Sequence, residues 1–104
     1  MKTANVLVHG RLAGRLEELE PGRRYRFIYQ SGYDGPPISL TMPTTSQEYA
    51  FDRFPPFFEG LLPEGIMLEG LLKQNKIDKL DYFSQLMAVG GDMVGSVTVK
   101  EVAQ

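Results

Sequence analysis

The sequence predicts an α+β fold: a mainly antiparallel, curled or partly barrel-like sheet of about five strands, with two or three helices inserted before the last strand. Three observations support this class. Apolar and polar residues alternate through the first half of the chain, between turns that contain glycine or proline. Apolar residues then recur at helical spacing between Pro56 and Gly91, and alternation returns in Val94–Val102. Short connections favour hairpins, and a strand that follows the helices must pair with an early one.

The first half of the chain is predicted to form strands wherever the alternation is unbroken. These segments are Asn5–His9, Leu12–Leu19, Arg23–Gln30, Ile38–Met42 and Glu48–Asp52. Gly10 is suited to a tight turn in the first hairpin because glycine adopts positive φ freely. Leu12 and Leu16 are predicted to share one side of the second strand. Glu20-Pro21-Gly22 is a second turn, and Ser31–Pro37 is a loop by composition.

The central segment Phe54–Gly65, FPPFFEGLLPEG, combines five large apolar residues with five prolines and glycines. Pro56 suits the first turn of a helix, and Pro63 should end it. A segment this apolar must be buried, either in the domain core or under a partner. A second helix is predicted for Ile66–Asn75. The chain therefore passes from strands to helices at this segment.

A third helix is predicted to begin at Asp78, which is a good N-cap, and to end at Gly90-Gly91. Its core stripe is Leu80, Phe83, Leu86 and Met87. The glycine-rich stretch Gly90–Gly95 lies between a helix and a strand, which is the wrong order for a phosphate-binding loop.

Composition restricts the classes of function. The chain has 104 residues, which suits one domain spanning 1–104, and 42% of them are hydrophobic. The formal net charge of −2 at pH 7 argues against direct DNA binding. The absence of cysteine excludes disulfides and thiolate zinc sites. Neither a signal peptide nor a run of about 20 apolar residues is present, so we expect a cytoplasmic protein that does not enter a membrane.

No catalytic constellation is visible. His9 is the only histidine, and the sequence offers it no metal-binding or catalytic partner. The cluster of Glu17, Glu18 and Glu20 is typical of a solvated sheet edge. Glu59 and Glu64 flank the apolar central segment, where carboxylates keep the rim of an apolar patch soluble. We therefore expect a protein without enzymatic activity, metal or cofactor.

Four motifs in the same order resemble the N-terminal subdomain of HipA-type serine/threonine kinases, the toxins of bacterial toxin–antitoxin modules. They are VHGRLAGRL (Val8–Leu16), PISLTMP (Pro37–Pro43), FFEGLLPEG (Phe57–Gly65) and DYFSQLMAVGGDMVGSVTV (Asp81–Val99). The kinase catalytic region of that family has no counterpart in this sequence. The chain is therefore similar to the small HipS-like proteins of three-component HipBST systems.

This resemblance implies an antitoxin that binds and inhibits a HipA-like kinase, HipT. It also implies a ternary complex with a HipB-like helix-turn-helix protein. The alternative is an accessory subunit that completes or stabilises the kinase, and bridges it to the HipB-like protein, without inhibiting it. An enzyme in its own right is the third possibility, which the lack of catalytic residues disfavours.

The partner-binding residues are expected in the helix and loop that follow the two central prolines. We expect Phe57, Leu61 and Leu71 to be core, and Ile66 or Met67 to be exposed. The segment would lie near the active-site cleft of the kinase and block substrate access or domain closure. The candidate contact residues are Phe58, Glu59, Leu62, Pro63, Glu64, Gly65, Ile66 and Met67.

Overall fold

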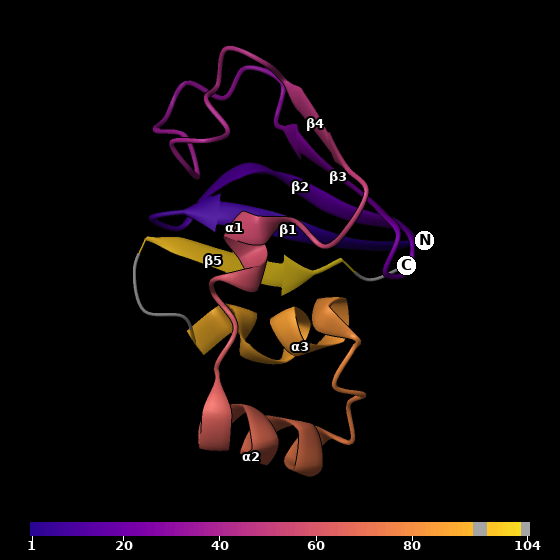
Figure 1. Cartoon of the computed structure of the whole chain (residues 1–104). Helices are drawn as coiled ribbons and strands as arrows, with labels where there is room; N and C mark the ends of the chain where they lie inside the picture. Colours follow the sequence, from indigo (N-terminus) through magenta and orange to yellow (C-terminus); the bar gives the residue numbers. More distant parts are fainter. Residues whose placement is uncertain (93–95, 103–104) are drawn as a thin grey trace.

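Five antiparallel strands form one open sheet in the order β4-β3-β2-β1-β5, within the described residues 1–92 and 96–102 of a computed structural model (Figure 1). The strands are β1 (Lys2–Val8), β2 (Arg11–Glu20), β3 (Arg24–Tyr29), β4 (Glu48–Phe51) and β5 (Val97–Glu101). The helices α1 (Pro56–Glu59), α2 (Gly65–Asn75) and α3 (Tyr82–Val89), and the 3₁₀ turn η1 (Gly90–Asp92), precede β5. The predicted α+β class is confirmed, and the sheet does not close into a barrel.

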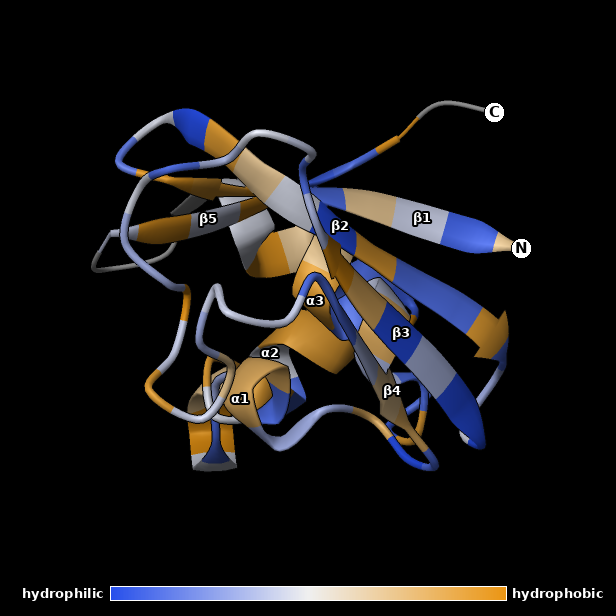
Figure 2. Ribbon diagram, turned by 90° about the horizontal axis from the view of Figure 1, so that it is seen from above, coloured by the Kyte–Doolittle hydropathy of each residue, from blue (hydrophilic) through white to orange (hydrophobic). Residues whose placement is uncertain are grey.

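One face of the sheet is apolar and forms the floor of the core. In β3 the buried residues Tyr25, Phe27 and Tyr29 alternate with more exposed ones, and Figure 2 shows strongly hydrophilic bands near the start of the strand and hydrophobic ones further along it. The rings of Phe27 and Tyr29 meet edge to face, with centroids 4.8 Å apart. Burying each such side chain stabilises the fold by about 1.5–3 kcal/mol. The strand pattern read from the sequence is thus the pattern of burial.

The first hairpin turns as predicted, but it contains a bulge. His9 and Gly10 both have positive φ, 50° and 79°, as a two-residue turn between twisted strands requires. The register shifts between Val6 and Leu7, because Val6 faces Gly14 while Leu7 faces Leu12. The extra residue, Ala13, is fully buried, and Leu12 is 38% exposed. The prediction that Leu12 shares the inner side with Leu16 is therefore wrong, because a bulge shifts side chains between faces.

The segment Ile38–Met42 does not form the predicted strand. Its only ladder contact is an isolated bridge between Ser39 and Met42. Ile38 and Met42 are buried, whereas Leu40 is 96% exposed. The buried hydroxyl of Tyr29 makes the hydrogen bonds that a neighbouring strand would otherwise make with this segment. It accepts a hydrogen bond from the Ile38 amide at 3.0 Å and donates one to the Met42 carbonyl at 2.5 Å. The loop is thereby fixed to the core without entering the sheet.

The helices differ from prediction mainly at their ends. Helix α1 stops at Glu59, and the next residues continue as a turn in which the Leu61 amide donates to the Phe58 carbonyl at 3.1 Å. Helix α3 begins later than predicted, because Asp81 and not Asp78 accepts a hydrogen bond from the third residue of the helix, the amide of Ser84, at 3.1 Å. Asp78 instead accepts from the Leu80 amide at 2.8 Å.

The core stripe of α3 therefore loses its predicted first member, since Leu80 lies outside the helix and is 71% exposed. Phe83 and Leu86 are fully buried, as predicted, and Met87 is partly buried against the core. The last strand begins at Val97, and residues 93–95 lie outside the described part of the chain.

The molecule has three layers in the view of Figure 1: the sheet, then α3 beside β5, then α2 on the far side of α3. Strand β5 forms one edge of the sheet and pairs with β1, so that Val6 faces Val99. The fully buried Phe58 of α1 and Phe83 of α3 fill the space over the sheet. Among the described residues, none of the helices is both long and apolar enough to span a membrane.

Candidate partner-binding surface

The candidate surface begins at a residue that is firmly inside the core. Phe58 has no exposed surface, and its ring lies 6.1 Å from the ring of Phe27 and 5.2 Å from that of Phe57. Phe58 is one of the contact residues predicted from the sequence. The structure places its side chain out of a partner's reach, because α1 turns this face toward the sheet. Phe58 therefore anchors the segment and is not part of its surface.

The remaining candidates form a continuous surface feature, which we call the α2 tip (Leu62–Met67). Leu62 and Pro63 are half-buried, and the rest of the tip is exposed. Ile66 and Met67 are 86% and 76% exposed, which confirms the expectation for these two residues. Glu59, also exposed, lies one turn before the tip. Whether these residues contact a partner stays a prediction.

A sharp turn at Gly65 directs the tip outward. Gly65 has a φ of 60°, which glycine adopts without penalty, and nothing lies within 4 Å of the position a Cβ would occupy. The helix starts there, so Ile66 and Met67 occupy its first turn. Half-buried Leu68 and Leu71 belong to the same helix, in which no residue is buried. The expectation of a buried Leu71 is therefore not met, while Phe57 and Leu61 pack partly against the core.

Sequence reasoning missed an apolar groove of about 250 Å³ next to α1. It is lined by Thr41, Met42, Tyr49, Phe51, Pro56 and Phe57. Exposed Leu40 adjoins this lining in sequence. The groove combines a loop, strand β4 and α1, which are separate in the chain, so no local pattern could have revealed it.

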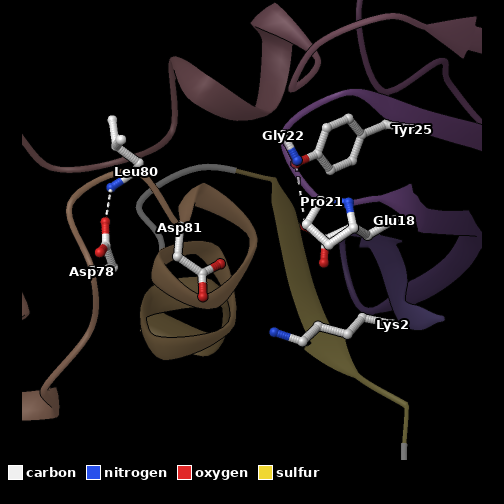
Figure 3. A pocket seen from close by; sticks show the side chains of 8 residues that line it. All are labelled: Lys2, Glu18, Pro21, Gly22, Tyr25, Asp78, Leu80 and Asp81. Carbon is white, nitrogen blue, oxygen red and sulfur yellow. Dashed lines mark hydrogen bonds between the residues drawn. The ribbon is translucent and has the colours of Figure 1, made fainter.

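A larger pocket of about 510 Å³ opens between one end of the strands β1, β2 and β3 and the start of α3 (Figure 3). It is lined by Lys2, Glu18, Pro21, Gly22, Tyr25, Asp78, Leu80 and Asp81. The Tyr25 hydroxyl accepts from the Gly22 amide at 2.7 Å and donates to Glu18 at 3.2 Å. Burial raises the pKa of the Tyr25 hydroxyl, and the nearby Glu18 carboxylate adds to the shift.

The polar groups of this pocket already have structural partners. The Asp78 carboxylate accepts a hydrogen bond from the Leu80 amide, just before α3, and the Asp81 carboxylate accepts one from the Ser84 amide in its first turn. The Lys2 ammonium donates a hydrogen bond to the Ser84 hydroxyl at 3.3 Å. Within the described residues, no group of three or more acidic or histidine side chains could hold a metal ion. His9 is exposed in its hairpin turn. The pocket therefore supplies no arrangement that suggests a reaction.

Comparison with known proteins identifies the family. The family model described as the HipA N-terminal domain matches residues 4–100. The chain belongs to the HipA N-terminal domain family. A solved structure titled "N-terminal domain of HipA toxin" has 28% sequence identity and a TM-score of 0.78, with 100% of this chain and 95% of that chain covered. An uncharacterized protein of Haemophilus influenzae is 31% identical over 104 residues, which span all of this chain and 96% of the relative.

The match places the sheet and the α2 tip in one HipA N-terminal domain, since residues 4–100 include all but the first two residues of β1 and the last of β5. The likeness of fold is consistent with this, as the solved HipA domain covers the whole chain. What is matched is an N-terminal domain of a HipA toxin.

Proposed function

We propose that this chain binds a HipA-like serine/threonine kinase and inhibits it, as a HipS-like antitoxin. The α2 tip carries the proposal: a HipA N-terminal domain presents two adjacent large apolar side chains, Ile66 and Met67, with more than three quarters of each exposed. Apolar side chains that stay uncovered on a small domain are typical of a contact surface. Their shared position in the first turn of α2 makes them a compact anchor.

The surroundings of the α2 tip have the anatomy of an interface. Half-buried Leu62 and Pro63 extend the apolar surface, and exposed Glu59 and Glu64 lie beside it in sequence. Binding energy in interfaces concentrates in a few apolar anchors inside a polar rim. We therefore expect the kinase to offer an apolar recess with basic residues at its edge. We propose that this contact lies near the active-site cleft of the kinase, where the tip would block substrate access or domain closure.

In the proposed complex, DNA binding belongs to another protein than this chain. A HipB-like helix-turn-helix protein would contact DNA in a ternary complex with the kinase and this chain. The chain itself, with a formal net charge of −2 at pH 7, is a poor ligand for the phosphate backbone.

The first experiment is co-expression of the kinase with this chain in a growth assay. The wild-type chain should restore growth, whereas Ile66→Asp and Met67→Asp should fail. A carboxylate inside an apolar recess loses its hydration without a partner, which should weaken binding by about 2 kcal/mol or more, about 30-fold. Leu40→Asp is the matched control, because Leu40 is even more exposed than Ile66 and Met67 but lies on a different segment. It should restore growth like the wild type.

Binding of the purified proteins, measured by calorimetry, separates the two roles. Tight binding with unchanged kinase activity would show an accessory subunit that does not inhibit. Normal neutralisation by Ile66→Asp would exclude the α2 tip as the contact. Thermal unfolding of each variant provides the control for folding, and the midpoint should not change, since the substituted side chains are exposed.

A further inference from the structure

We infer that α2 opens independently of the rest of the domain: it leaves α3 and loses its helical structure while the sheet, α1 and α3 stay folded. The first observation is burial. Helix α2 has 11 residues, and none of them is buried. In contrast, α3 has three buried residues among eight, Phe83, Gln85 and Leu86. Segments with little buried apolar surface open at low free energy, far below that of global unfolding.

The second observation is where α2 is held. Its main contact among the described elements is with α3, and the sheet lies on the other side of α3 (Figure 1). The half-buried residues of α2 are Leu68, Leu71 and Leu72. The buried residues of the hydrophobic core, which include Phe27, Phe58 and Phe83, all lie outside α2. Removal of α2 therefore leaves the interior between the sheet, α1 and α3 intact.

The third observation is that α2 has few features that would stabilise it as an isolated helix. Gly65 and Lys76, at its two ends, have left-handed φ values of 60° and 54°. Glu64 precedes the helix without a side-chain capping bond, and Gly70 weakens its middle. An isolated helix of about 11 residues is marginal in water even with a favourable sequence. Once it leaves α3, α2 therefore melts.

The opening has a consequence for binding that rests on the proposed function. The first turn of α2 holds Ile66 and Met67 next to each other. A partner that binds the α2 tip therefore binds only the closed, helical form. Its apparent affinity is then reduced in proportion to the fraction of molecules that are closed. The opening itself depends on no partner.

Hydrogen exchange of the free protein, followed by mass spectrometry, tests the opening. Amides of residues 69–75 should exchange at least about 100-fold faster than amides in the last turn of α3. Low concentrations of urea should accelerate exchange in α3 but hardly change it in α2, because local opening exposes little new surface. Equal protection in the two helices, with the same urea dependence, would overturn the inference.

A pair of variants sharpens the result. Leu71→Ala should accelerate exchange in α2 about 10-fold, because the lost contacts belong only to the α2–α3 docking, and should lower the global free energy of unfolding by no more than the corresponding ~1.4 kcal/mol. Leu86→Ala, in the buried face of α3, should lower protection in α3 and the sheet but leave exchange in α2 unchanged, because Leu86 stays buried when α2 opens. Loss of protection in α2 for Leu86→Ala as large as in α3 would show that α2 unfolds with the core. No kinase is used, so this outcome is independent of the antitoxin assay.

Discussion

The Tyr29 hydroxyl holds the long loop between β3 and β4 at two points. It bonds the Ile38 amide and the Met42 carbonyl, and its ring stacks on Tyr33 with centroids 5.7 Å apart. Both backbone groups are buried, so loss of the hydroxyl leaves two polar groups without partners. The loop between residues 30 and 47 is thus ordered by a side chain and not by a sheet ladder.

Tyr29→Phe should therefore destabilise the protein by about 1–3 kcal/mol, as measured by urea unfolding. Tyr33→Phe is the matched control. Its hydroxyl donates to the Pro36 carbonyl at the surface, where water can replace it, so the change should be within about 0.5 kcal/mol. Equal stability of Tyr29→Phe and the wild type would contradict the role assigned to the hydroxyl.

At the scale of elements, the contact between η1 and β5 depends on the absence of one side chain. A Cβ built at Gly90 would lie 2.2 Å from the Val99 carbonyl oxygen, whereas one at Gly91 meets nothing within 4 Å. Backbone cannot yield as a flexible side chain does. This close approach brings the end of α3 against β5, which in turn pairs with β1.

Gly90→Ala should consequently lower the free energy of unfolding by about 2–3 kcal/mol, because β5 and η1 must move apart. Gly91→Ala has no such clash and should be neutral within about 0.5 kcal/mol. Thermal or urea unfolding of the two variants measures the difference. If both variants unfolded like the wild type, the backbone contact at Val99 would be unimportant for stability.

At the scale of the whole molecule, the core includes two phenols whose ionisation opposes folding. Burial raises the pKa of Tyr25 and of Tyr29 above the ordinary value of 10.0. Below pH 10 the hydroxyls are protonated in both states, and their contribution to stability is fully present. Above that pH the unfolded chain releases these protons first, so the unfolded state binds fewer protons and stability falls as pH rises.

The protein should therefore lose stability as the pH rises above about 10, as urea midpoints measured below and above this pH would show. Part of the loss should disappear in Tyr29→Phe, because one buried phenol is removed. An identical slope in Tyr29→Phe would mean that Tyr29 does not ionise differently in the two states.

The sequence by itself determined the α+β class, the first hairpin and the family, since alternation, turn glycines and motif order are properties of neighbouring residues. It also determined that Ile66 or Met67 would be exposed, from the outward turn expected at Pro63–Gly65. The sequence also predicts a strand at Glu48–Asp52, because Tyr49 and Phe51 alternate with polar or small residues, and the structure has it as Glu48–Phe51.

Tertiary structure decided the rest. Phe58 and Ile66 are both apolar residues of the same central region, yet one has no exposed surface and the other is 86% exposed. Only the packing of α1 on β3 separates them. Likewise, Ile38–Met42 has the alternation of a strand, but the Tyr29 hydroxyl satisfies its backbone and leaves Leu40 exposed. Local pattern predicts which face of an element is apolar, but whether that face is buried also depends on which distant segments meet it.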